Sequence, residues 1–173
     1  MCVIIYKPSG VEMPSSQILW DCYRVNHHGM GFATPKTVFR TLSYQQFFDA
    51  IKAVKTSEPC IIHFRWATHG SVKRTNCHPF SNGGVKFAHN GVLPIESKND
   101  MTDSEIAFRN IIYPAIQHNG FKSEEADRVI SQTAGGSRFA IMVGKDVELF
   151  GHWDEIDGCF YSNLNWQRYS FIW

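Results

Sequence analysis

Apolar positions in this chain occur in two kinds of segment, short compact runs and longer stretches with helical spacing. The compact runs are rich in β-branched and aromatic residues and are bounded by turn-forming residues, which is typical of strands. They predict strands at residues 1–7, 31–33, 37–42, 60–67, 85–89, 139–143, 147–150 and 159–162. The polar segment 76–84 predicts a loop.

The longer stretches predict four helices, at residues 15–25, 44–55, 102–118 and 123–133. In the first, Ile18, Leu19, Cys22 and Val25 have the spacing of one helix face. The second and third begin with Ser43-x-x-Gln46 and Thr102-x-x-Glu105, the spacing of a capping box. Pro114 lies within the third helix and predicts a kink or a break there.

The order of these elements indicates the fold class. Strands and helices do not alternate regularly as β-α-β units, which argues against a doubly wound parallel sheet. Mixed or antiparallel sheets with helices packed outside them fit better, so we expect an α+β fold.

Length and charge narrow the possible functions. The 173 residues are 43% hydrophobic, which predicts a single domain, residues 1–173, with a substantial core. A formal net charge of +1 without basic or acidic runs gives no reason to expect a nucleic-acid or membrane partner. Five irregularly spaced cysteines, and a start without a charged segment before its apolar run, favour reduced thiols in a cytoplasmic protein.

Cys2 is the first candidate for chemistry. If Met1 is removed, Cys2 carries both a thiol and a free α-amine, and its small side chain generally permits that removal. An α-amine has a pKa of roughly 7.7–8, so it is partly neutral near pH 7 and is able to accept the thiol proton. The alternative is that Cys2 is a small apolar residue at the start of a strand.

Three further sites match the needs of amide-bond chemistry. Asn90 and Gly91 offer a side-chain amide N–H and a backbone N–H for an oxyanion, although Asn-Gly is also a common hairpin turn. Arg65 follows a predicted strand and suits a carboxylate, with a surface ion pair as the alternative. Asp103 suits an α-ammonium group, or it only favours a helix N-terminus.

The eight histidines and the remaining cysteines suggest no cofactor and no metal. None of them has zinc-finger or H-E-x-x-H spacing. We expect His63 and His89 to be core or supporting residues, and His27-His28 to end a helix. Cys77, in the polar segment, is expected to be the most exposed of the remaining thiols.

Three motifs together resemble the class II glutamine amidotransferases, which are N-terminal-nucleophile hydrolases. They are Arg65-Trp66-Ala67-Thr68-His69-Gly70, Asn76-Cys77-His78-Pro79 and His89-Asn90-Gly91. They are similar to segments of the glutaminase domain of glucosamine-phosphate synthase, as is Thr102-Asp103-Ser104-Glu105. Residues 26–32 and 159–163 are more similar to small stand-alone amidotransferase-like proteins.

The resemblance implies a four-layer αββα sandwich of two largely antiparallel sheets. It implies hydrolysis of the glutamine side-chain amide through a γ-glutamyl thioester on Cys2, with release of ammonia. Asn90 and Gly91 would form the oxyanion hole, and Arg65 and Asp103 would bind the substrate carboxylate and amine. A further set would line the glutamine pocket or its closing loop: Trp66, Thr68 and His69.

Two departures from the family pattern leave alternatives open. The chain reads Asn26-His27-His28-Gly29 where the family often has Arg-Gly-x-Asp, and it has no room for a synthase domain. An ammonia acceptor would therefore belong to a separate synthase subunit. The alternatives are a γ-glutamyl amidohydrolase acting on a modified substrate and a catalytically silent binding or regulatory subunit. The apolar segment 169–173 predicts either docking onto the core or a partner contact.

Overall fold

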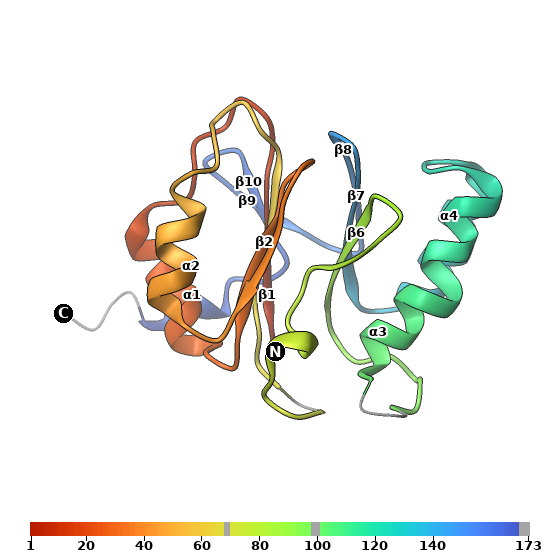
Figure 1. The fold of residues 1–173 in the computed structure, drawn as a ribbon, viewed down its shortest axis with the longest axis horizontal. Coiled ribbons are helices and arrows are strands. Elements are labelled where there is room, and N and C mark those ends of the chain that lie inside the picture. Colours follow the sequence, from red (N-terminus) through yellow and green to blue (C-terminus); the bar gives the residue numbers. More distant parts are fainter. Residues whose placement is uncertain (68–69, 98–100, 170–173) are drawn as a thin grey trace.

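The computed structural model describes residues 1–67, 70–97 and 101–169, and within them two antiparallel sheets face each other (Figure 1). The first sheet has the strand order β3-β2-β4-β1-β10-β9 and the second has the order β5-β6-β7-β8. The strands of the first sheet are β1 (Val3–Lys7), β2 (Met30–Ala33), β3 (Val38–Thr41), β4 (Cys60–Phe64), β9 (Asp154–Ile156) and β10 (Cys159–Tyr161). Those of the second are β5 (Phe80–Asn82), β6 (Val85–Asn90), β7 (Arg138–Val143) and β8 (Asp146–Phe150).

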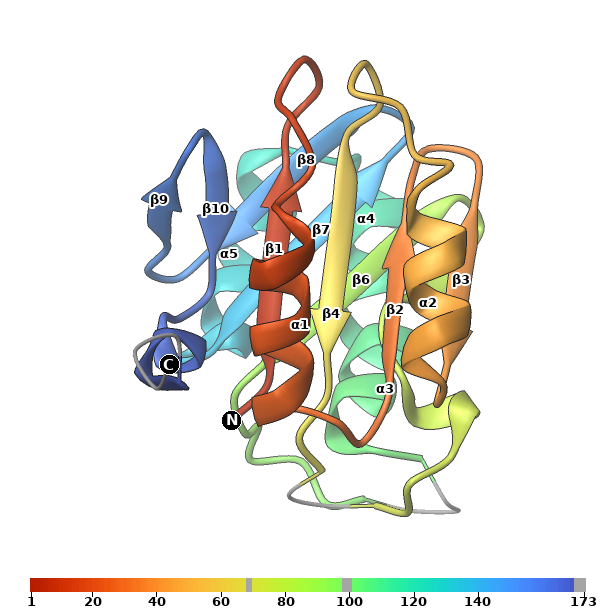
Figure 2. The same ribbon diagram turned by 90° about the vertical axis from the view of Figure 1, so that its left-hand side faces the viewer.

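Helices cover the outer face of each sheet. Figure 2 shows α1 (Ser16–Val25) and α2 (Tyr44–Ile51) lying across the first sheet. The second sheet is covered by α3 (Asp103–Ala107), the π-helical turn η2 (Phe108–Ile112), α4 (Tyr113–Asn119) and α5 (Glu124–Ala134). Short 3-10 turns, η1 (Arg74–Asn76) and η3 (Asn165–Tyr169), complete the elements. The expected α+β fold with four αββα layers is confirmed.

The apolar side chains form three layers of core. The largest two lie between each sheet and its helices, for example Phe47 against Phe64 on one side and Phe87 against Phe108 on the other. Between the sheets the apolar cluster is small, and its buried members are Ile4, Ile61, Ala88, Ala140 and Met142. Because successive side chains of a strand point to opposite faces, a strand between two cores needs apolar residues throughout, which explains the compact runs in the sequence.

The predicted helix starts are confirmed. The side chains of Ser43 and Thr102 accept hydrogen bonds from backbone N–H groups three residues later, and Ser15 and Ser123 cap α1 and α5 in the same way. The predicted long third helix is not interrupted at Pro114: residues 103–119 are helical throughout, with the π-helical turn η2 between α3 and α4, and Pro114 lies in the first turn of α4.

Three predictions were wrong. Segment 76–84 contains the short strand β5, which pairs with β6 at Phe80 and Phe87. Strand β9 was missed because an edge strand that reads Asp-Glu-Ile carries no apolar run. Cys77 is fully buried, since its thiol packs against the Thr41 carbonyl (3.8 Å).

Asn90-Gly91 is not a hairpin turn. Asn90 ends β6, whose neighbours in the sheet are β5 and β7. The segment 170–173, most of the apolar tail considered above, lies outside the described residues.

Three buried imidazoles lie in one group near the end of the inter-sheet layer. The rings of His63 and His78 are 4.4 Å apart, and those of His78 and His89 are 6.5 Å apart. His63 donates from Nε2 to the carbonyl of His89 (3.2 Å), which links β4 to β6. Burial lowers the pKa of His63 to about 3 and that of His89 to about 4, and it lowers the pKa of His78 as well.

We predict that acid destabilises the fold through these three histidines. Their ordinary pKa is 6.5, so between that value and the lowered folded values the unfolded chain binds more protons than the folded one. The free energy of unfolding should therefore fall as the pH drops below about 6.5, by up to about 1.4 kcal/mol per pH unit for each histidine.

Urea denaturation at several pH values measures this slope. His78→Phe removes one titrating ring, so the change in the free energy of unfolding per pH unit should decrease by the contribution of one histidine. His118→Asn replaces an exposed histidine and should leave this slope unchanged. Equal slopes for His78→Phe and the unmodified protein would contradict the assignment.

Candidate active site

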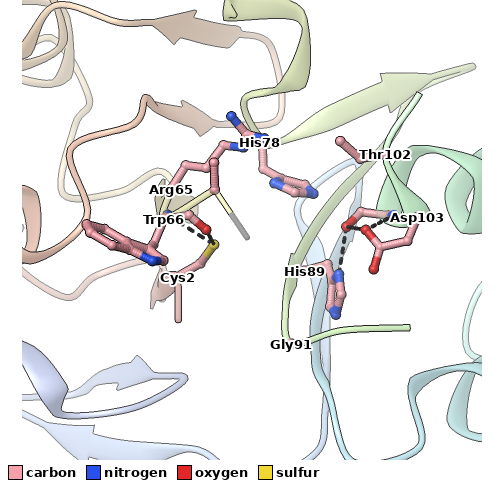
Figure 3. Close-up of a pocket in the computed structure, with 10 residues that line it drawn as sticks. Cys2, Arg65, Trp66, His78, His89, Gly91, Thr102 and Asp103 are labelled. Carbon is pink, nitrogen blue, oxygen red and sulfur yellow. Dashed lines mark hydrogen bonds between the residues drawn. The ribbon is translucent and has the colours of Figure 1, made fainter. Parts of the chain in front are cut away.

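A pocket opens where β1, β4 and β6 come together at one end of the sandwich (Figure 3). The pocket is small: its cavity volume is about 30 Å³, well below the ~300–1,000 Å³ typical of small-molecule sites. Its lining residues are Cys2, Arg65, Trp66, Ala67, His78, His89, Gly91, Thr102, Asp103 and Ser104. The pocket thus collects residues from both sheets and from the start of α3.

Cys2 lies directly before β1, and its sulfur contacts the chain that leaves β4. The backbone N–H of Trp66 donates to Sγ (3.3 Å), and the thiol donates to the Trp66 carbonyl (3.5 Å). The Cys2 carbonyl accepts from the side chain of Asn163 (2.8 Å). Burial raises the pKa of the Cys2 thiol, and the Trp66 N–H, the N-terminal amine and Arg65 oppose that shift only in part. The sulfur is therefore protonated near pH 7 and needs a base.

Arg65 is almost completely buried, at 4% exposure, in the wall of the pocket. Its backbone N–H donates to Gly29 (2.8 Å), and its guanidinium donates from Nη1 to the Ser71 carbonyl (3.1 Å). The second contact holds the guanidinium in the pocket wall, where the Arg65 side chain extends toward His78 (Figure 3). A buried guanidinium in a small pocket can bind a carboxylate with two parallel hydrogen bonds.

Trp66 is supported by a residue that sequence reasoning assigned only to a helix end. The ring of His28 stacks on Trp66, with centroids 4.6 Å apart, and His28 Nδ1 accepts from the N–H of Ala67 (3.0 Å). Burial, and the neighbouring His27 and Arg65, lower the pKa of His28, which keeps this nitrogen free to accept. No sequence signal pointed to this role, because the contact joins residues 39 positions apart.

Gly91 lines the pocket, whereas Asn90 lies behind it. The Asn90 amide donates from Nδ2 to Ser162 Oγ (3.0 Å), and the same oxygen accepts from the Ile4 N–H (2.8 Å). Gly91 has a φ of 148°, and a Cβ there would clash with Ser137 and lie 3.0 Å from His89 Nε2. Position 91 therefore requires glycine.

Asp103 begins α3 on the opposite side of the pocket from Cys2 (Figure 3). Its Oδ2 accepts from the N–H of Leu93 (2.9 Å), and its Oδ1 accepts from the N–H of Ser104 (2.7 Å) and from the Ser104 hydroxyl (3.1 Å). The Ser104 oxygen lies 2.7 Å from His89 Nδ1. Ser104 and His89 are supporting residues that the sequence did not single out for this task.

The structure thus brings together five of the candidate residues at the pocket: Cys2, Arg65, Trp66, Gly91 and Asp103. Asn90 adjoins them without lining the pocket, and Thr68 and His69 lie outside the described residues.

Within the described part of the chain, no group of three or more His, Cys, Asp or Glu side chains is arranged to hold a metal ion. No helix in that same part is long and apolar enough to span a membrane.

Comparisons with known proteins show the family of this chain. The profile of the family described as "Glutamine amidotransferases class-II" matches residues 48–135, just over half of the chain. Glutamine–fructose-6-phosphate aminotransferase (isomerizing) of Lactococcus lactis subsp. lactis is 34% identical over 101 residues, and that of Bacillus licheniformis is 32% identical over 102. The matches cover 50% and 51% of this chain but only 16% of each relative.

The fold has a solved counterpart. A structure described as the allosteric regulatory enzyme of purine biosynthesis superposes with a TM-score of 0.59 at 16% sequence identity, covering 93% of this chain and 41% of that one. It shares the sandwich of two sheets between helices, which confirms the expected fold. The chain belongs to the class II glutamine amidotransferases, a family of N-terminal-nucleophile amidohydrolases.

Proposed function

We propose that this protein hydrolyses the side-chain amide of glutamine through a γ-glutamyl thioester on Cys2 and releases ammonia to a separate acceptor enzyme. The observation that carries the proposal is the position of Cys2, the second residue of the chain, in a pocket between Arg65 and Asp103. Because burial raises the pKa of this thiol, it needs a base, and a free terminal amine on the same residue would supply one.

Removal of Met1 starts the proposed mechanism, because it frees the α-amine of Cys2. That amine takes the thiol proton, and the sulfur attacks the amide carbon of the substrate. The carbonyl oxygen becomes an oxyanion, which accepts from the N–H of Gly91 and from the second N–H of the Asn90 amide. The protonated amine returns its proton to the leaving nitrogen, and ammonia departs. Water, deprotonated by the same amine, then cleaves the thioester to give glutamate.

Two charged groups select the substrate in this proposal. Arg65 binds the α-carboxylate, and Asp103 binds the α-ammonium from across the pocket, so the γ-glutamyl head is held at both charges. Trp66, which lines the pocket, contacts the bound substrate in this proposal. Both charged groups are held by backbone contacts, so little reorganisation accompanies binding.

The ammonia acceptor is proposed to lie outside residues 1–173. The segments that match the two aminotransferases make up 16% of their length, so their remaining parts have no counterpart in the alignments. We propose that residues 1–173 form one glutaminase domain that works in the cytoplasm with a synthase subunit. The substrate is glutamine or another γ-glutamyl amide, and no nucleic acid or membrane takes part.

We predict that the expressed protein loses Met1 and reacts once with 6-diazo-5-oxo-norleucine, a glutamine analogue that alkylates such nucleophiles. Intact-mass spectrometry should show a mass lower by one methionine, then a single adduct that is missing in Cys2→Ala. Cys60→Ala removes a fully buried thiol and should leave the adduct unchanged.

Each other outcome has a definite meaning. Retained Met1 without an adduct would contradict the proposal and favour a catalytically silent binding subunit. An adduct without glutamine turnover would favour an amidohydrolase for a modified γ-glutamyl substrate.

We further predict that kcat/KM for glutamine rises with pH on its acidic limb. The reactive form needs a neutral α-amine, so activity increases as the pH rises through the pKa of that amine, roughly 7.7–8 when unperturbed. The Cys2 thiol does not supply the limb, since its own pKa is raised. Initial rates of ammonia release at different pH values measure it. A flat profile between about pH 6 and pH 9 would exclude the amine as the base.

A further inference from the structure

The Asp103 carboxylate is held by three donors before any substrate binds. Two N–H groups reach it, from Leu93 to Oδ2 and from Ser104 to Oδ1, and the Ser104 hydroxyl makes a second contact with Oδ1 (3.1 Å). A carboxylate has about four acceptor positions, so about one remains for a ligand. Because Asp103 lines the pocket, this position is available to a cation inside it.

The hydrogen-bond geometry determines where the protons of Ser104 and His89 lie. Ser104 has a single hydroxyl proton, and only its donation to the acceptor Oδ1 of Asp103 makes that contact attractive. The 2.7 Å contact between Ser104 Oγ and His89 Nδ1 then requires the imidazole to donate. His89 therefore carries its proton on Nδ1, and its Nε2 lies close to Gly91.

The chain of donors runs from strand β6 to the Asp103 carboxylate. His89 is 2% exposed within β6, and its carbonyl is held by His63 from the other sheet (3.2 Å). Ser104 is 5% exposed in the first turn of α3. The lowered pKa of His89, about 4, keeps the ring neutral and in one tautomer near pH 7. Such a chain restrains a carboxylate more tightly than its own backbone contacts alone.

We propose that His89 and Ser104 are positioning residues that orient the Asp103 carboxylate toward the α-ammonium of the substrate and thereby set the requirement for that group. The proposal rests on the proposed function, in which Asp103 binds the ammonium. Recognition of the ammonium then depends on a chain of hydrogen bonds from His89 through Ser104 to Asp103, rather than on Asp103 alone.

The test compares two ligands that differ only in the ammonium group. L-glutamine carries it, whereas glutaramate keeps the carboxylate and the amide but has no α-amine. Binding is measured by calorimetry in a Cys2→Ala background, so that no turnover is needed, and kcat and KM are measured in parallel with Cys2 present. Ser104→Ala should weaken glutamine binding about tenfold, as expected for losing a hydrogen bond to a charged group, and leave glutaramate binding unchanged.

Conservative variants separate positioning from folding. Ser104→Thr keeps the hydroxyl, and His89→Asn places an amide N–H near the position of Nδ1, so both should bind glutamine within about twofold of the unmodified protein. His89→Leu should behave like Ser104→Ala. Asp103→Asn should have the largest effect, because it should abolish the preference for glutamine over glutaramate. Ser123→Ala removes the cap of α5 outside the pocket, and it should lower the melting temperature without changing the preference.

The outcomes distinguish this proposal from the proposed function. Equal weakening for both ligands in Ser104→Ala would mean a structural role and would overturn the proposal, as would no change for either. Loss of the preference in a protein without glutamine turnover would support positioning and contradict catalysis. If neither ligand binds the Cys2→Ala protein, both proposals fail.

Discussion

The antiparallel pairing of β1 with β4 determines where the chemistry of this chain takes place. Val3 pairs with Phe64, so Cys2 and Arg65, the next residues outward, meet at the end of the ladder. The contacts between Cys2 Sγ and the Trp66 backbone are the direct result. Val3 and Ile5 pack in the layer under the helices and Ile4 packs between the sheets, so a shift of one residue would move each of these side chains into the other layer.

The second requirement is a fixed separation between the sheets, because the pocket takes residues from both. The apolar cluster between them is small, and two hydrogen-bonded links supplement it near the site. Ser162 Oγ joins the Ile4 N–H of the first sheet to the Asn90 amide of the second, and His63 donates to the His89 carbonyl. These directional contacts locate Gly91 and Asp103 relative to Cys2 more narrowly than apolar packing does.

Local rules predicted most of the framework. Compact apolar runs gave eight of the strands, and the capping residues Ser43 and Thr102 marked two helix starts correctly. The missing strand β5 is three residues long with two polar side chains, so only its pairing with β6 creates it. Cys77 is buried for a similar reason: a polar stretch is folded inward by contacts with the Thr41 carbonyl and the close approach of Gly29.

The candidate site was predictable to the extent that it depends on strand ends and on family motifs. Cys2 lies directly before β1, and Arg65 and Gly91 lie directly after β4 and β6, so knowing the strands places them. The supporting residues were not predictable in this way. His28 contacts Trp66 and Ala67 from a distant part of the chain, 39 positions before Ala67. Ser104 differs from any other serine in the first turn of a helix only through its contact with His89.

Buried histidines give this site polarity without charge. A carboxylate or a cation at position 63 or 89 would need an ionic partner in the buried layer between the sheets, whereas a neutral imidazole needs one hydrogen bond for its N–H. His63 and His89 each have such a bond, to the His89 carbonyl and to Ser104. The neutral histidines of the pocket wall add no charge between Arg65 and Asp103. The charges of these two residues therefore act on a substrate without being offset by the wall.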